Sequence, residues 1–250
     1  MLSTQDPPAD PRFRSRPTFG PEGPTGAFVS AALFGALGVV ALSAVLPGAG
    51  VLAGAMALAL YLVGATLAGR ALARTYPFRR LGLCNLVTLG RLALVGALVA
   101  PTAAGVGPSW AVLAVAVVAL TLDGVDGWMA RRYGLVSAFG ARFDMEVDSA
   151  FALVLALNAA IGSEAGALVV LLGLPRYAFL AAGMACPWMR PALPDRFSRK
   201  VVAVAHMAAL IAMQAPLLPP SGAAVMAAAV AGLVGWSFAR DILWLWRGRA

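Results

Sequence analysis

"LDGVDGWMARRYGLVSAFGARFDMEVDSAF", residues 122–151, places five acids inside or against segments apolar enough for a lipid bilayer: Asp123, Asp126, Asp144, Glu146 and Asp148. An ionised side chain at membrane depth is costly, so a group of acids there indicates a functional site. The meaning of this stretch therefore depends on whether the surrounding segments are membrane helices.

The composition of the chain is that of an integral membrane protein. Its 250 residues are 61% hydrophobic and 12% charged, and its mean hydropathy is +0.84, values that lie far outside those of soluble domains. The apolar runs are continuous and lack the alternation of barrel strands, so they predict an all-α polytopic membrane protein. The net charge of +8 fits basic loops on one side of a membrane, and no nucleic-acid partner is expected.

Eight apolar runs predict the domain organisation. They span residues 27–46, 51–69, 86–100, 109–130, 143–161, 166–185, 201–218 and 223–244. We expect a disordered cytoplasmic tail (1–26), a transmembrane hairpin (27–69), an interfacial amphipathic segment (70–84) and a six-helix domain (85–246). Basic and uncharged connections alternate along the chain, which predicts a multi-pass inner-membrane protein with both termini and the acidic site on the cytoplasmic side.

Helical spacing predicts that four of the five acids share one site. Asp123 and Asp126 lie about 60° apart around a helix, and Asp144 and Asp148 about 40° apart. Two facing helices would therefore present four carboxylates to one point. Glu146 points away from the Asp144 and Asp148 face and is not expected to be a ligand.

Four carboxylates in an apolar site repel one another unless cations neutralise them. Two divalent ions, Mg²⁺ or Mn²⁺, satisfy this requirement and leave positions open for phosphate. Gly127, Ala130 and Gly140 would leave space for a nucleotide beside the metals, and Arg131 can bind its phosphate oxygens. A cation or proton transporter that uses the acids as its binding site is the alternative from another class.

The pattern Asp123-x-x-Asp126-Gly127-x-x-Ala130-Arg131, followed by Gly140-x-x-x-Asp144-x-x-x-Asp148, resembles the signature of the CDP-alcohol phosphotransferase family at all eight fixed positions. The resemblance extends from Leu81 to about Trp244. It implies a six-helix bundle, here preceded by an extra hairpin, that cleaves the pyrophosphate of a CDP-linked alcohol, releases CMP and joins the phosphoalcohol to a hydroxyl acceptor. A homodimer is common in this family.

The resemblance also implies roles for individual residues. Asp123, Asp126, Asp144 and Asp148 would hold the two ions, and Asp148 would deprotonate the acceptor. The nucleotide would be bound by Asn85, Thr88, Arg91, Gly127, Ala130, Arg131 and Gly140, although Cys84 replaces the Pro that often precedes the first of these. Apart from the resemblance, Arg176 inside an apolar span and the cations Arg196, Arg199 and Lys200 of the next basic connection are expected to contact the acceptor. The alternatives are an ion pair with one of the acids for Arg176 and membrane topology for the other three.

The expected donor is CDP-diacylglycerol, and the expected acceptor is a small polar alcohol or its phosphate, as in phosphatidylglycerophosphate and phosphatidylinositol-phosphate synthases. Transfer from a soluble CDP-alcohol such as CDP-choline onto diacylglycerol is the alternative within the family. The sequence identifies neither the acceptor nor the lipid chains.

Overall fold

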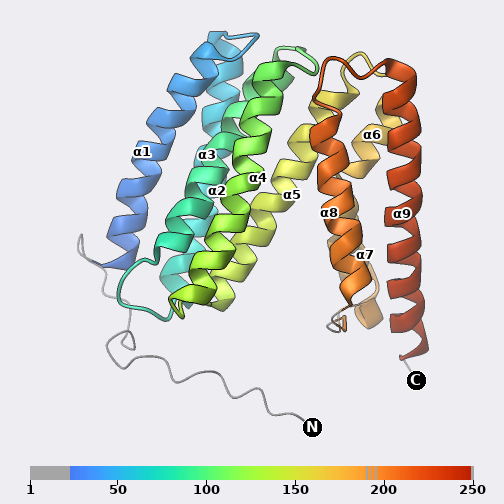
Figure 1. Ribbon diagram of the computed structural model, residues 1–250. Coiled ribbons are helices and arrows are strands. Elements are labelled where there is room, and N and C mark those ends of the chain that lie inside the picture. The colour runs from blue at the N-terminus through green and yellow to red at the C-terminus, as the bar shows by residue number, and fades with distance from the viewer. Residues whose placement is uncertain (1–22, 190, 192, 195, 249–250) are drawn as a thin grey trace. The chain divides into compact units, whose positions relative to one another are not determined.

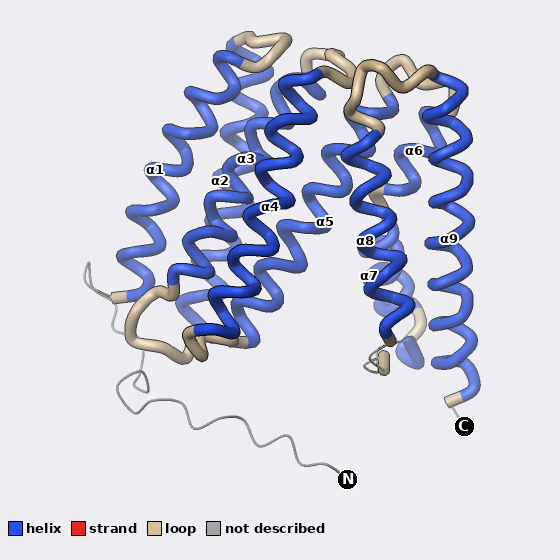
Figure 2. Tube along the Cα trace, in the orientation of Figure 1, coloured by secondary structure: helices blue, strands red, loops and turns tan. Residues whose placement is uncertain are grey.

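The computed structural model describes residues 23–189, 191, 193–194 and 196–248. These residues form helices joined by loops, with no strand among them (Figure 1, Figure 2). Within this part of the chain five helices are long and apolar enough to cross a membrane: α1 (Pro24–Val45), α2 (Val51–Thr75), α3 (Leu83–Ala103), α4 (Trp110–Arg132) and α9 (Pro220–Arg247). The all-α class is confirmed, and the protein is a multi-pass membrane protein.

The remaining helices are α5 (Ala138–Ala160), α6 (Gly166–Leu172), α7 (Pro175–Ala185) and α8 (Phe197–Ala212), with a short 3₁₀ turn at Pro187–Met189. The expected single span at 166–185 is instead the pair α6 and α7, bent by 66°. Pro175 has no N–H to continue the hydrogen-bonding of α6, and a Cβ at Gly173 would lie 2.9 Å from the Cα of Leu153. Counted as one span, the bent pair raises the number of candidate spans in the described residues to six. The eight-span topology stays a prediction.

Two predicted boundaries also differ from the structure. Residues 1–22 of the predicted tail lie outside the described residues, and residues 24–26 already belong to the first turn of α1. The predicted interfacial segment at 70–84 is not a separate element. Its first part continues α2 as far as Thr75, a loop follows at 76–82, and α3 begins at Leu83.

The chain divides into two compact units, residues 1–104 with 114–148 and residues 105–113 with 149–250. In the first unit α1, α2 and α3 pack against one another. Tyr61 of α2 is fully buried and donates a hydrogen bond to the carbonyl of Ala32 in α1 (2.9 Å). A Cβ at Gly96 of α3 would lie 3.0 Å from the Cβ of Tyr61, so a glycine lets these two helix backbones approach closely.

A buried aromatic cluster joins the N-terminal hairpin to the start of α5 in the first unit. Phe28 of α1 lies edge-on to Phe143 of α5, with ring centroids 6.1 Å apart, and Phe143 stacks on Phe139 at 5.7 Å. Tyr76, in the loop after α2, contacts both Phe139 (5.7 Å) and Phe78 (5.5 Å). The hairpin therefore supports the part of α5 that carries the acids.

In the second unit, α6 and α8 both pack against α9. Gln214, just after α8, is fully buried, and its amide donates to the carbonyls of Leu155 (3.0 Å) and Leu210 (2.9 Å). Because a buried amide is costly unless it is hydrogen-bonded, these contacts fix α8 against the second half of α5.

Candidate active site

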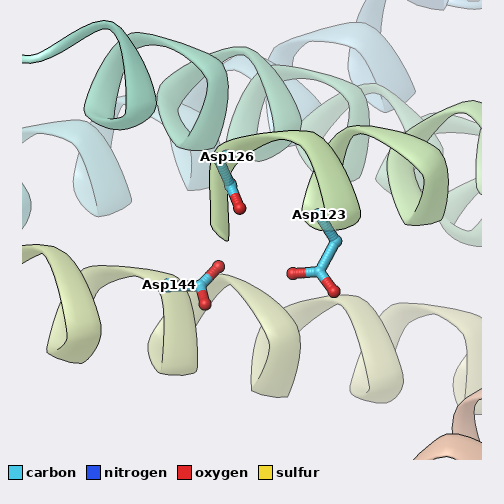
Figure 3. Close-up of side chains that lie close together, drawn as sticks. All are labelled: Asp123, Asp126 and Asp144. Atoms are coloured by element: carbon cyan, nitrogen blue, oxygen red, sulfur yellow. The ribbon is translucent and has the colours of Figure 1, made fainter. Parts of the chain in front are cut away.

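Two helices of the first unit bring three carboxylates together. Asp123 and Asp126 lie in the last three turns of α4, and Asp144 lies in the second turn of α5. Figure 3 shows the three side chains turned toward one another across the gap between the helices. One oxygen from each carboxylate lies within 4.8 Å of the other two. The spacing of these acids in the sequence is thus matched by their convergence in space.

Asp148, one turn further along α5, is not part of that compact set in the described residues. Its carboxylate instead contacts Nη2 of Arg91. Glu146 is exposed, whereas Asp144 and Asp148 are half-buried. Glu146 thus lies on a more exposed face of α5 than Asp144 and Asp148.

Arg91 of α3 is the cation at the centre of the cluster. The residue is only 1% exposed, and its Nη1 lies 2.7 Å from Asp123, 3.2 Å from Asp126 and 2.6 Å from Asp144. Its Nη2 contacts Asp148, so one guanidinium forms ion pairs with all four aspartates. Four ionised carboxylates and one guanidinium sum to a charge of −3, so the cluster still requires positive charge.

Asp126 is the inner member of the cluster. Its side chain is 4% exposed, and its Oδ2 accepts from the hydroxyl of Thr88 at 2.9 Å. The side chains of Asp123, Asp144 and Asp148 are between 35% and 40% exposed. Thr88 and Arg91 thus fix the inner carboxylate from α3, while the other three remain accessible to a ligand.

These residues fit a divalent cation. Carboxylate oxygens are the hard donors that Mg²⁺ and Mn²⁺ prefer, and the three close carboxylates can supply one oxygen each. The charge of the cluster remains negative after Arg91 is counted. The cluster could therefore hold a metal ion.

Asn85 and Gly140 bring α3 and the start of α5 into contact. A Cβ at position 140 would lie 3.1 Å from Oδ1 of Asn85 and 3.2 Å from Oγ of Ser137, so any larger residue there would have to displace one of these side chains. Ser137 precedes α5 and accepts the N–H of Gly140 at 3.0 Å, as an N-cap residue does. Ser137 was not among the residues expected at the site, although its position before a helical run is a recognisable cap signal.

Gly127, Ala130 and Arg131 follow Asp126 on α4. The first two are half-buried, and Arg131 is exposed. A Cβ at Gly127 would lie 3.4 Å from Nη1 of Arg131, so the arginine folds back along its own helix toward the acids. This position suits an arginine that binds a phosphate group near the carboxylates.

The four cations predicted to bind the acceptor all lie in the second unit. Arg199 is already engaged, because its Nε bonds Oδ2 of the buried Asp241 of α9 at 3.0 Å. Arg176 and Arg196 are half-buried, and Lys200 is exposed. Their assignment to an acceptor site stays a prediction. Asp241 was not among the residues expected to have a role, although an acid within an apolar run is itself a signal.

A family model described as CDP-alcohol phosphatidyltransferase matches residues 81–236, more than half of the chain. The match begins just before α3 and includes all four aspartates of the cluster, whereas α1 and α2 lie outside it. Comparisons with curated proteins and with solved structures gave no significant match.

Proposed function

The chain belongs to the CDP-alcohol phosphatidyltransferase family, and we propose that it transfers the phosphatidyl group of CDP-diacylglycerol to a small polar alcohol or alcohol phosphate in phospholipid biosynthesis. CMP is the second product. The observation that carries this proposal is the aspartate cluster around Arg91, in which one carboxylate is buried and three are accessible.

In the proposed reaction Asp148 accepts the proton of the acceptor hydroxyl. Its side chain is 40% exposed and lies outside the compact set of three carboxylates, so one of its oxygens is accessible to a substrate. The acceptor oxygen then bonds to the phosphorus that carries diacylglycerol. The bond from this phosphorus to the bridging oxygen of the pyrophosphate breaks, and the electron pair leaves with CMP.

Two divalent cations, Mg²⁺ or Mn²⁺, held by Asp123, Asp126, Asp144 and Asp148 would neutralise the charge of the pyrophosphate and of the leaving group. Arg91 keeps the four carboxylates together when no substrate is bound. We assign the cytidine phosphates to Arg131 and the surface beside Gly127 and Ala130.

The remaining nucleotide contacts come from Asn85, Thr88, Arg91 and Gly140. Thr88 and Arg91 also touch Asp126, so nucleotide binding and the arrangement of the carboxylates are coupled through α3. The acceptor is assigned to Arg176, Arg196, Arg199 and Lys200, whose positive charge suits a phosphorylated alcohol.

We place the site on the cytoplasmic side of the inner membrane. The loop at 76–82 and the turn at 133–137 lie at the same end of the first unit (Figure 1). Arg79 and Arg80 lie in this loop, and Arg131 and Arg132 end the helix before the turn. Clustered arginines favour the cytoplasmic side, and the same rule places both termini there. The homodimer stays a prediction from the family resemblance.

A transporter that uses the acids to move cations or protons is less well supported. Acids of a conduction path are distributed through the membrane depth, whereas these acids occupy the last turns of α4 and the first turns of α5, on either side of one short connection. Transfer from a soluble CDP-alcohol onto diacylglycerol would use the same carboxylate chemistry. An experiment is therefore needed to distinguish this reaction from transfer out of CDP-diacylglycerol.

The test uses purified protein in detergent with Mg²⁺ and two donor mixtures. One contains CDP-diacylglycerol labelled in its glycerol backbone with a panel of polar alcohols and alcohol phosphates, and the other contains labelled CDP-choline with diacylglycerol. We expect a labelled phospholipid and an equal amount of CMP from the first mixture alone. Product from the second mixture alone would overturn the donor assignment, and cation flux into vesicles without CMP release would favour the transporter.

A further inference from the structure

We propose that Tyr76, in the loop between α2 and α3, is a positioning residue of the nucleotide site, which orients the side-chain amide of Asn85 toward the bound cytidine. This inference rests on the proposed function. Tyr76 lies outside the segment that the family model matches, 81–236, so it belongs to the part of the chain that this protein adds to the family domain.

The hydroxyl of Tyr76 makes three hydrogen bonds in a buried position. The residue is 2% exposed. Its hydroxyl accepts from the backbone N–H of Gly82 at 2.9 Å and from Nδ2 of Asn85 at 3.2 Å, and it donates to the carbonyl of Arg80 at 3.3 Å. These contacts connect the loop at 76–82 to the first turn of α3.

The hydrogen bond to Arg80 determines which way the amide of Asn85 faces. A tyrosine hydroxyl carries one proton, and here that proton points to a carbonyl that can only accept. The atom of Asn85 that faces the hydroxyl must therefore be the donor, the NH₂ group. The amide oxygen consequently faces the other way.

That oxygen lies close to Gly140 of α5, on the side of the residue where a side chain would begin. It lies 3.1 Å from the position that a Cβ would occupy on this glycine, and the hydrogen bond to Tyr76 engages Nδ2 of Asn85 and not this oxygen. An amide oxygen held in this way is an acceptor for an N–H or O–H group of a ligand, as the amino group of cytosine or a ribose hydroxyl provides.

The ring of Tyr76 is held independently of its hydroxyl. It packs edge-on against Phe78 and Phe139, with interplanar angles of 74° and 81°. Phe139 directly precedes Gly140 on α5. Tyr76→Phe therefore removes the hydroxyl, keeps these ring contacts and leaves the NH₂ of Asn85 without its acceptor.

The measurement is CMP affinity without turnover, by calorimetry on the full-length protein in detergent with Mg²⁺, together with steady-state kinetics. For Tyr76→Phe we expect the Kd of CMP and the KM of CDP-diacylglycerol to rise about tenfold, because one oriented hydrogen bond to the ligand is lost. We expect kcat to change by less than about twofold, because Asp148 and the carboxylate cluster are untouched.

Tyr61→Phe is the matched control. It deletes the hydroxyl of another buried tyrosine, in α2, whose hydrogen bond goes to the carbonyl of Ala32 in α1. It is expected to lower thermal stability and leave the Kd of CMP unchanged. In an Asn85→Ala background, Tyr76→Phe is expected to cause no further loss of CMP affinity, because its effect passes through that amide.

Equal Kd values for Tyr76→Phe and Tyr61→Phe, in a protein that binds CMP, would overturn this inference alone. So would an undiminished effect of Tyr76→Phe in the Asn85→Ala background. A wild-type protein that neither binds CMP nor releases it would overturn the proposed function as well. Should Tyr76→Phe not fold, 3-fluorotyrosine at position 76 keeps the hydroxyl with a weaker acceptor oxygen, and a Kd equal to that of the wild type would then contradict the proposal.

Discussion

Replacing Arg91 by alanine should make the stability of the protein depend on divalent cations. The pair with Asp126 is buried on both sides, with side chains 2% and 4% exposed, and breaking a buried pair costs about 3–5 kcal/mol. The pairs with Asp123, Asp144 and Asp148 involve carboxylates that are 35–40% exposed, so solvent screens them and each adds less than about 1 kcal/mol. The buried pair therefore dominates, and we expect a loss of about 3–5 kcal/mol from it without metal.

The assay is the unfolding temperature of the purified protein in detergent, followed by tryptophan fluorescence in EDTA and in Mg²⁺. At about 2–4 °C per kcal/mol for a chain of this size, Arg91→Ala should lower Tm by about 6–20 °C in EDTA. Mg²⁺ should recover a large part of this loss, because a cation that binds the folded cluster stabilises it by mass action. The wild-type protein should gain less from Mg²⁺.

Leu92→Ala is the control for lost volume. Leu92 follows Arg91 on α3, is 8% exposed and packs at Gly64 of α2. Its truncation should lower Tm by a similar amount in both buffers, since it leaves a cavity and no unpaired charge. The reasoning fails if Arg91→Ala unfolds at the wild-type temperature in EDTA, or if Mg²⁺ raises the Tm of Leu92→Ala as much as that of Arg91→Ala.

Three further substitutions test single assignments. Asp148→Asn should lower kcat by about 10²–10⁴-fold, as loss of a positioned base does, and retain CDP-diacylglycerol binding in an equilibrium assay; kcat near wild type would exclude Asp148 as the base. Gly140→Ala should raise the KM of the donor, because the new Cβ lies 3.1 Å from Oδ1 of Asn85; an unchanged KM would refute the close contact. Arg199→Ala should raise the KM of the acceptor more than that of the donor, and equal effects would indicate a structural role for its ion pair.

The shared helix face of Asp123 and Asp126, and that of Asp144 and Asp148, were predictable because they follow from helix geometry. Spacings of three and four residues fix side chains on one face of a helix. The place of Arg91 at the centre of the cluster was not predictable in this way. The family resemblance grouped it with Asn85 and Thr88 as a nucleotide contact, but its distance from the acids depends on how α3 packs against α4 and α5.

The hydrogen bonds of Tyr76 also could not be predicted from a local sequence pattern, because its three partners are set by the path of the loop at 76–82.

The bend between α6 and α7, in contrast, has a signal in the sequence. Gly173 and Pro175 stand within the run at 166–185, and both are recognised helix breakers. The hydrophobicity of the run predicted one continuous span, but Gly173 and Pro175 interrupt the helix and produce the bend.

The most direct test of the central claim is CMP release from CDP-diacylglycerol in the presence of an accepted alcohol, compared between Mg²⁺ and EDTA. The measurement includes Asp123→Asn, which alters a carboxylate 2.7 Å from Arg91, and Glu146→Gln, which alters an exposed acid of α5. The account predicts CMP release by the wild-type protein and by Glu146→Gln in Mg²⁺, none in EDTA, and little from Asp123→Asn. Full CMP release in EDTA, or a folded Glu146→Gln that is inactive while Asp123→Asn works, would contradict it.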